Sequence, residues 1–435
     1  MRLYLIKILI SFYVFILKTK KSKKTSNRSI VFFNTHDRGG GAAKICFQLF
    51  NATTNAVFFV KEKRTSLDKV FEFEPDLWNR LGEYARGIER KQGIIDFGKI
   101  GLLKLMYNKY FKESSVVHLH NSHGYYLSFF AIQQVFRSKK VIWTLHDDYL
   151  LTGHCSFSME CDKWLLGCNK CPDLSIYPAL QSDTTKKNQD EKLKCLLKIQ
   201  PYIITPSKWL FEKVKTKYPF LKNVGLIYNG VDIDVFKPLN NTINIKQKYN
   251  IPVDKKVVLF VAELSLKNPF KGGDILLEIM ENFKLDSSFV FLTVGGLDYN
   301  SNQIISLPYI QDDFSLSELY NAADVMLYPT KADNLPLVIL ESMACGTPVI
   351  ASDIAGIPEI IDHKEDGYLI EKNNIREFIN TINYYFDLPL TLRKQVSELA
   401  RKKVTTKFSL KDMIKGYDSI YKLLGCVIVF QNLIE

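Results

Sequence analysis

Residues 333–352 read Asp333-Asn-Leu-Pro-Leu-Val-Ile-Leu-Glu341-Ser-Met-Ala-Cys-Gly346-Thr-Pro-Val-Ile-Ala-Ser352. Proline suits the first turn of a helix and glycine the position after its end, so Pro336 and Gly346 predict a short helix between them. The apolar run that ends at Ser352 predicts a buried strand of a parallel sheet. The segment therefore predicts a loop, a helix and a strand of an α/β fold, with two carboxylates eight positions apart.

The start of this helix is a candidate ligand site. The first N–H groups of a helix lack partners within it, and the helix dipole adds positive potential there. We therefore expect the backbone around Asn334, Leu335 and Leu337 to attract anions and hydroxyls. Asp333 can accept a hydrogen bond from a sugar hydroxyl, and Glu341, two turns further on, can reach a ribose. The alternative is an ordinary capped surface helix on a sheet.

Short apolar runs alternate with helix-length segments along most of the chain, a pattern typical of parallel sheets. One series of predicted strands precedes residue 229 and a second follows it, and 435 residues of which 46% are hydrophobic can bury two cores. The strands are predicted at 30–34, 56–60, 116–120, 141–145 and 202–205, and then at 257–262, 288–294, 324–328 and 348–352. Two series predict two doubly wound domains.

The segment at Asp333 resembles the E-x7-E signature of the family-4 retaining glycosyltransferases, with Asp333 in place of the first glutamate. Further motifs follow the order of that family and extend the resemblance from about residue 30 to 421. They are Thr205-Pro-Ser-Lys208, Asn229-Gly-Val-Asp232, Val294-Gly-Gly296, Ile354-Ala-Gly-Ile-Pro-Glu359 and Asp366-Gly367. The resemblance implies the GT-B fold, an α/β architecture of two Rossmann-like doubly wound parallel-sheet domains facing a cleft.

The expected domain boundaries follow from this resemblance and from the two series of strands. Residues 29–230 are expected to form an acceptor-side domain and residues 231–408 a nucleotide-sugar-binding domain. The C-terminal helices, within 409–435, are expected to pack back on the first domain.

Two lysines are expected to bind the donor diphosphate. Lys271, which precedes a glycine, resembles the family's phosphate-binding lysine. The arginine that the family usually carries nearby is absent, and Lys267 is its expected substitute, although an ammonium lacks the two-pronged geometry of a guanidinium. The alternative for each is a solvated surface lysine.

Two further places are expected to contact the donor. Gly40 and Gly41 lie in the sequence Arg38-Gly-Gly-Gly-Ala42 after the first predicted strand, and glycines let a backbone approach a ligand closely. The resemblance implies that this loop faces the donor phosphates, although a glycine turn between strand and helix is common in any α/β sheet. Ile310 lies where the family holds the nucleotide base.

Two histidines end the predicted strand at 116–120. Strand alternation puts His118 and His120 on one face, and ligands of open α/β sheets bind beyond the carboxyl ends of the strands. The resemblance implies that His120 lies near the donor sugar and the attacking acceptor. The alternative is a hydrogen-bonded structural histidine, a role that suits His118 better. We expect no catalytic metal, because the family resembles metal-independent catalysts.

Four of the eight cysteines are clustered. A Cys-x2-Cys pair with two more thiols nearby, and His154 as a spare ligand, could hold a structural zinc or an iron-sulfur centre. The alternatives are reduced thiols or a redox pair, because the spacing departs from that of standard zinc ribbons. The four are Cys155, Cys161, Cys168 and Cys171. A subset of the family carries a similar His/Cys-rich insertion in its N-terminal domain.

The N-terminal extension, residues 1–28, combines an apolar run at 3–17 with six basic residues between 18 and 28. The run is shorter than the roughly 20 residues of a membrane span and lacks a cleavage site. We expect it to associate with a membrane surface; a poorly ordered extension and a short signal anchor are the alternatives. A cytoplasmic protein, peripheral or anchored at the cytoplasmic face of the inner membrane, is the expected location.

The sequence thus predicts a retaining hexosyltransferase that uses a nucleotide-diphosphate sugar and a glycan or lipid-linked acceptor in surface polysaccharide synthesis. The formal charge of +12 favours anionic partners, but no basic stripe with interleaved aromatics predicts nucleic-acid binding. The alternatives are another GT-B enzyme, such as a sugar phosphorylase or nucleotide-sugar epimerase, and a noncatalytic carbohydrate-binding protein.

Overall fold

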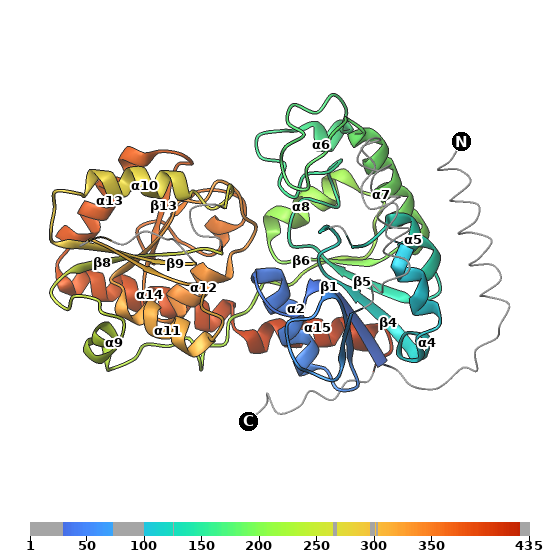
Figure 1. Ribbon diagram of the computed structural model, residues 1–435, viewed down its shortest axis with the longest axis horizontal. Coiled ribbons are helices and arrows are strands. Elements are labelled where there is room, and N and C mark those ends of the chain that lie inside the picture. Colours follow the sequence, from blue (N-terminus) through green and yellow to red (C-terminus); the bar gives the residue numbers. More distant parts are fainter. Residues whose placement is uncertain are drawn as a thin grey trace. The chain divides into compact units, whose positions relative to one another are not determined.

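The computed structural model describes residues 29–72, 100–124, 126–263, 268–295, 301 and 303–426. The chain divides into two compact units (Figure 1). The first comprises residues 1–205, 211–226 and 416–435, and the second comprises residues 206–210 and 227–415. Residues 1–28, Lys267, Gly296 and residues 427–435, which include parts of the expected sites and segments, lie outside the described residues.

The first unit is built on a seven-stranded sheet in the order β3-β2-β1-β4-β5-β6-β7, with every neighbouring pair parallel. Its strands are β1 (Ser29–His36), β2 (Val57–Glu62), β3 (Val70–Glu72), β4 (Ser114–Leu119), β5 (Lys140–Thr144), β6 (Tyr202–Thr205) and β7 (Val224–Leu226). The helices in this part of the chain are α2 (Gly41–Ala52), η1 (Ile100–Met106), α4 (Lys109–Glu113), α5 (Phe129–Val135), α6 (Lys163–Leu166), α7 (Thr185–Ile199) and α8 (Lys208–Lys217).

The second unit is built on a six-stranded parallel sheet in the order β10-β9-β8-β11-β12-β13. Its strands are β8 (Lys256–Val261), β9 (Phe289–Val294), β10 (Ile304–Leu307), β11 (Val325–Tyr328), β12 (Val349–Ser352) and β13 (Tyr368–Ile370). Its helices are α9 (Thr242–Lys248), α10 (Gly273–Asn282), α11 (Asp313–Ala322), α12 (Leu337–Ala344), η3 (Ile357–Glu359), α13 (Ile375–Asp387) and α14 (Leu390–Lys407). Apolar side chains of α10 and α13 pack with those of the strands into one buried core.

These two parallel sheets confirm the predicted fold class of two doubly wound α/β domains. In each sheet the strand order reverses direction once, between β1 and β4 in the first unit and between β8 and β11 in the second. Loops leaving two such neighbouring strands run to opposite sides of the sheet and leave a crevice at the carboxyl ends, where α/β proteins bind ligands. Each unit therefore has one topologically favoured ligand position.

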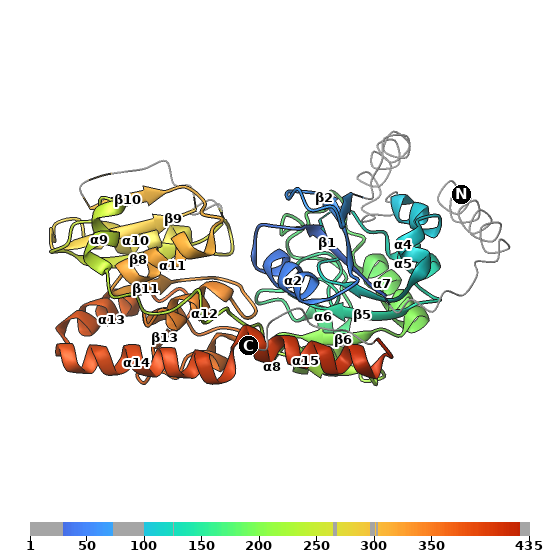
Figure 2. The ribbon, with the colours of Figure 1, turned by 90° about the horizontal axis from the view of Figure 1, so that it is seen from below.

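The last helix is α15 (Leu410–Leu423), labelled in Figure 2. Two of its tyrosines hydrogen-bond to residues of the first sheet. The Tyr421 hydroxyl lies 2.8 Å from His118 Nδ1, and the Tyr417 hydroxyl lies 2.9 Å from Thr144 Oγ1. All four side chains are buried. Specific polar contacts therefore join this helix to strands β4 and β5.

In the part of the chain that the structure describes, every helix is too short or too polar to cross a membrane.

Tyr421→Phe tests the contribution of this contact. Removing the hydroxyl leaves His118 Nδ1 buried without its partner, which costs about 2 kcal/mol. For a unit of this size we expect a melting temperature lower by on the order of 5 °C, measured by calorimetry. Tyr384→Phe is the control, because Tyr384 is 51% exposed. Equal melting temperatures for the two variants would contradict a stabilising role for the contact.

Candidate functional site

The candidate donor site of the second unit lies at its strand reversal. Lys271 belongs to the loop between β8 and α10, and Asp333 to the loop between β11 and α12. These loops leave the two strands between which the sheet order reverses. The topology thus brings together the two residues that the sequence analysis assigned to the diphosphate and the sugar.

Lys271 and Asp333 form an ion pair between Nζ and Oδ2, with Tyr328 as a third member. Lys271 Nζ donates to the Tyr328 hydroxyl at 2.9 Å, and that hydroxyl donates to Asp333 Oδ2. The Lys271 side chain is only 24% exposed and that of Asp333 14%. Burial works to lower the pKa of Lys271, but Asp333 and then Tyr328 outweigh it and raise that pKa above its ordinary value. Lys271 is therefore a permanent, largely buried cation.

The two loops that carry this pair are held together by backbone contacts. The Phe270 carbonyl accepts from Thr330 Oγ1 at 2.7 Å and from the Lys331 N–H at 2.7 Å. Gly272, the N-cap of α10, has a φ of 70°, and a Cβ there would lie 1.8 Å from the Pro329 carbonyl oxygen. A glycine is therefore required where the chain passes from Lys271 into α10.

At the start of α12, one of the N–H groups that were expected to face a ligand, that of Asn334, has a partner within the loop. The helix begins at Leu337, with Pro336 as its N-cap, and the Asn334 N–H donates to Asp333 Oδ1 at 2.8 Å. Asn334 is itself buried and its amide oxygen accepts from Ser207 Oγ at 2.5 Å. The Asn334 N–H therefore holds one carboxylate oxygen of Asp333, and Ser207 in turn holds the Asn334 side chain.

The other expected donor residues of the second unit lie near this edge of the sheet. The side chains of Leu335 and Leu337 are buried, and the Leu335 carbonyl accepts from Asn229 Nδ2 at 2.9 Å. Ile310 is half-buried in the loop between β10 and α11, at the carboxyl end of β10. The structure places these residues at the ends of strands, and their contacts with a donor stay a prediction.

Glu341 lies inside the second unit. It is 2% exposed, on α12, and its Oε2 accepts from the Tyr320 hydroxyl at 3.0 Å. Burial first, and then the charge of Glu341, raises the pKa of Tyr320 well above its usual range, so this hydroxyl stays a donor. The carboxylate is therefore oriented by a neutral tyrosine.

Three histidines of the first unit lie together at the carboxyl ends of β4 and β5, next to the strand reversal between β1 and β4: His118 lies in β4, His120 follows β4, and His146 follows β5. His118 has both ring nitrogens occupied, by Tyr421 and by Thr144 Oγ1 at 2.8 Å each, as suits a structural histidine. His120 Nδ1 lies 2.9 Å from His146 Nε2, whereas its Nε2 is buried without a hydrogen-bond partner among the described residues. His120 is therefore the histidine of this pair with an unused polar atom.

Burial keeps this cluster neutral. It lowers the pKa of His118 to about 3 and that of His146 to about 4, and that of His120 falls well below its ordinary value through burial, His118 and His146. In the His120–His146 bond one ring donates and the other accepts, so His120 Nε2 takes whichever role its Nδ1 does not. A neutral imidazole in this position can exchange a hydrogen bond with a hydroxyl.

A second dyad follows the same strands. His123 Nε2 lies 2.6 Å from Asp147 Oδ2, and both side chains are about seven-eighths buried, at 12% and 13% exposed. Burial works to raise the pKa of Asp147, but His123 outweighs it and the pKa is lowered.

Gly40 and Gly41 lie at the beginning of α2, beyond β1, and Gly40 has a φ of 71°. The glycine loop follows β1, and His120 and His123 follow β4; these are the two strands that flank the reversal.

The cysteine insertion contains free thiols. His154 Nε2 lies 3.4 Å from Cys171 Sγ, and the Gly153 N–H donates to Cys168 Sγ at 3.1 Å. Burial raises the pKa of Cys155 to about 12. Within the described ranges, no three His, Cys, Asp or Glu side chains form a group that could hold a metal ion. A structural zinc at Cys155, Cys161, Cys168 and Cys171 stays a prediction of the sequence.

The partners of the expected site residues were not predicted from the sequence. Tyr328 and Tyr320 are the hydroxyls that hold Asp333 and Glu341. Tyr328 ends a strand five positions before Asp333, and that position is a usable signal. Tyr320 lies in a helical sequence with no such signal. His146 could have been found, because it follows a strand as His120 does.

Comparison with known proteins gives the same assignment. Residues 241–403 match the family described as glycosyl transferases group 1. WcaC of Escherichia coli K12, a colanic acid biosynthesis glycosyl transferase, is 22% identical over 318 residues, which are 71% of each chain. An Escherichia coli UDP-Gal:alpha-D-GlcNAc-diphosphoundecaprenol alpha-1,3-galactosyltransferase is 28% identical over 48% of this chain, and the match spans 56% of that relative.

A solved structure shows the same fold. HepE of Anabaena, in complex with UDP-glucose, superposes with a TM-score of 0.63 and 16% identity. The match covers 91% of this chain and all of that one, at 100%.

Gly272→Ala tests the close approach of the two donor-site loops. The added methyl group would meet the Pro329 carbonyl, so we expect a loss of about 3 kcal/mol or more in the free energy of unfolding. Gly425→Ala is the matched control, because its φ is 78° but the nearest atom to its Cβ, Lys140 Nζ, is 3.8 Å away. The control should lose about 1 kcal/mol from backbone strain alone. Equal losses in denaturant unfolding would contradict the clash.

His118→Gln tests the burial of the histidine cluster through pH. His118 has a pKa of about 3 in the fold and about 6.5 when unfolded, so below pH 6.5 only the unfolded chain takes up its proton and stability falls. The variant lacks this penalty. Between pH 7 and pH 5 the free energy of unfolding, measured with urea, should therefore fall by about 2 kcal/mol more for the wild type than for His118→Gln. An equal fall for both proteins would show that His118 titrates normally.

Proposed function

Since this chain belongs to the group 1 glycosyltransferases of family 4, we propose that it transfers a hexose from a nucleoside-diphosphate sugar to a glycan or lipid-linked acceptor, with retention of configuration. Surface polysaccharide synthesis is the proposed pathway class, supported by the colanic acid relative. The observation that carries the proposal is the buried Lys271–Asp333 pair at the strand reversal of the second unit.

Lys271 is proposed to hold the donor diphosphate. The leaving diphosphate gains negative charge as the glycosidic bond breaks, and a fixed cation in a partly dry site stabilises that charge more than water does. The raised pKa of Lys271 keeps the ammonium charged throughout the neutral range. This lysine then supplies the charge stabilisation that a bound metal supplies in other transferases.

Asp333 is proposed to hold a hydroxyl of the donor sugar. Its Oδ2 accepts from both Lys271 and Tyr328. A diphosphate gives Lys271 a second anionic partner, which weakens its hold on Asp333 and frees one carboxylate lone pair for the sugar. The Asn334 N–H keeps the carboxylate in place during this exchange.

Glu341 and the loop at Ile310 are proposed to bind the nucleoside. The Tyr320 hydroxyl donates to Oε2 of Glu341 and orients the carboxylate, which is proposed to accept from a ribose hydroxyl. The UDP-glucose in the HepE structure and the UDP-Gal in the name of the Escherichia coli galactosyltransferase support a uridine nucleotide as the first donor to test.

His120 is proposed to contact the reacting groups. Its buried, unpartnered Nε2 can exchange a hydrogen bond with the acceptor hydroxyl or the donor sugar. In a retaining transfer the acceptor attacks from the face that the diphosphate leaves, so a phosphate oxygen can take the acceptor proton. No protein base is then needed, and His120 orients the reacting hydroxyl while remaining neutral.

The sequence of residues 1–28 supports a place for the protein at the cytoplasmic face of a membrane. Basic residues next to an apolar run favour an anionic lipid surface, where a lipid-linked acceptor would be available.

Lys271→Ala tests the donor role. We expect transfer and hydrolysis of a UDP-hexose to fall by about 100-fold or more, because a preorganised charge opposite the leaving group is lost. Glu341→Gln should raise the KM for the donor. Lys248→Ala removes an exposed lysine, which pairs with the mostly buried Glu318, and should keep wild-type activity. Melting temperatures of all variants exclude unfolding as the cause.

The products distinguish the alternatives. A labelled donor should yield a glycosylated acceptor with the anomeric configuration of the donor, read by proton NMR. A sugar phosphate formed from orthophosphate would identify a phosphorylase, and an epimerised product an epimerase. Full activity of Lys271→Ala would contradict the assignment of this lysine.

A further inference from the structure

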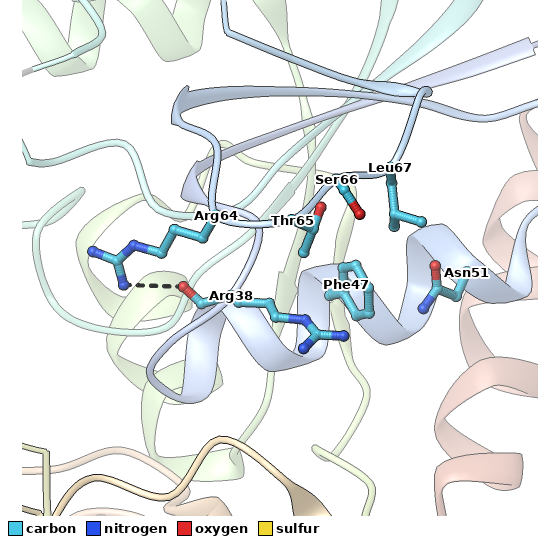
Figure 3. A pocket seen from close by; sticks show the side chains of 7 residues that line it. All are labelled: Arg38, Phe47, Asn51, Arg64, Thr65, Ser66 and Leu67. Atoms are coloured by element: carbon cyan, nitrogen blue, oxygen red, sulfur yellow. Dashed lines mark hydrogen bonds between the residues drawn. The ribbon is translucent and has the colours of Figure 1, made fainter.

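A pocket of about 490 Å³ opens in the first unit between helix α2 and the segment that follows strand β2 (Figure 3). It lies beyond the ends of β1 and β2, at the edge of the sheet where α/β proteins bind ligands. Its volume suits one sugar residue with a substituent. Its lining comprises Arg38, Phe47, Asn51, Arg64, Thr65, Ser66 and Leu67.

A buried carboxylate builds the wall of this pocket. Asp37 is fully buried; its Oδ1 accepts from the Arg64 N–H at 2.7 Å, and its Oδ2 from the Thr65 N–H at 3.0 Å and from the Thr65 hydroxyl. Arg64 Nη1 also donates to the Arg38 carbonyl at 3.1 Å. These bonds fasten the segment after β2 to the turn between β1 and α2. The pocket is therefore formed before a ligand binds.

The charge of the pocket is positive. Arg64 shares its charge with Glu62, since the Nε–Oε1 distance is 3.2 Å. The guanidinium of Arg38 has no carboxylate or carbonyl partner among the described residues, and its recorded contact is with the Phe47 ring, 5.4 Å from the centroid. None of the described lining residues is acidic. Arg38 is thus a cation held against an aromatic face and open to an anion.

The remaining lining groups suit a saccharide. Figure 3 shows Phe47 and Asn51 on helix α2, Ser66 across from them on the segment after β2, and the Arg38 guanidinium beside the Phe47 ring. Hydroxyl and amide groups can bind sugar hydroxyls, and an aromatic ring can pack against the apolar face of a pyranose. A guanidinium adds two-pronged recognition of a phosphate or carboxylate.

We propose that this pocket binds an anionic sugar of the acceptor, one that bears a phosphate or a carboxylate, with Arg38 as the residue that reads the charge. The proposal rests on the proposed function, because it names the substrate class for the acceptor of that transfer. It assigns Arg38 to specificity and not to the chemical step.

Binding of small anionic sugars tests the proposal directly. The full-length protein is first saturated with UDP, so that the donor site cannot take up the probe. Glucose 1-phosphate, glucuronate and neutral methyl glucoside are then titrated by calorimetry or ligand-observed NMR. We expect at least one anionic probe to bind about ten-fold more tightly than the neutral sugar, and Arg38→Gln to remove that preference.

Arg137→Gln is the matched control. Arg137 is an exposed arginine of the same unit, in the turn that leads into the amino end of β5, away from the edge that holds the pocket. Its variant has the same net charge as Arg38→Gln and should bind the probes as wild type does. Loss confined to Arg38→Gln supports the pocket, and the two anions separate a phosphate from a carboxylate preference.

The outcomes separate this inference from the proposed function. Failure of the wild-type protein to bind UDP would overturn the donor assignment on its own. Normal UDP binding with no preference for anionic sugars, or with equal losses in the Arg38 and Arg137 variants, would overturn the acceptor pocket and leave the transferase proposal standing.

Discussion

The ion pair between Lys271 and Asp333 is the interaction on which the donor site depends. It joins loops that leave β8 and β11, which are neighbours in the sheet although more than sixty residues separate the pair in sequence. Because the strand order reverses between these strands, the connecting helices lie on opposite sides and the loops cannot cover one another. The pair therefore spans the crevice that the topology leaves open.

An ion pair in such a place contributes little to stability, because the cost of removing two charges from water offsets most of their attraction. Its value is functional. Asp333 and Tyr328 keep Lys271 charged in a partly buried site, and Lys271 and Tyr328 hold one carboxylate oxygen of Asp333 in place. In the proposed function, binding of a sugar diphosphate would exchange one anionic partner of the lysine, Asp333, for another, the diphosphate. In the first unit, the groups next to the strand reversal are neutral instead of charged, because burial keeps His118 and His120 unprotonated.

The sequence predicted the central strands of both sheets, because buried parallel strands leave short apolar runs. It also predicted that Lys271, Asp333 and His120 lie beyond the carboxyl ends of strands, where the structure places them, whereas their roles in binding stay a prediction. The four strands that it did not predict are β3, β7, β10 and β13, and they are the edges of the two sheets. Edge strands here are three or four residues long, as at Val70–Glu72, and pairing with a neighbour defines them more than their composition does. Contacts between distant segments could not be predicted from the sequence either. The hydrogen bond between Tyr421 and His118, and the one from the Arg64 N–H to Asp37, join residues that are far apart in the sequence. No local sequence pattern predicts such contacts.

The most direct test of the account is a phosphorus NMR titration of UDP with the full-length protein. The account predicts that the β-phosphorus resonance of UDP shifts on binding to the wild type, because Lys271 contacts that phosphate. It also predicts that Lys271→Met, with an unchanged fold by circular dichroism, removes the shift. The same β-phosphorus shift in the wild type and in the Lys271→Met variant would contradict it.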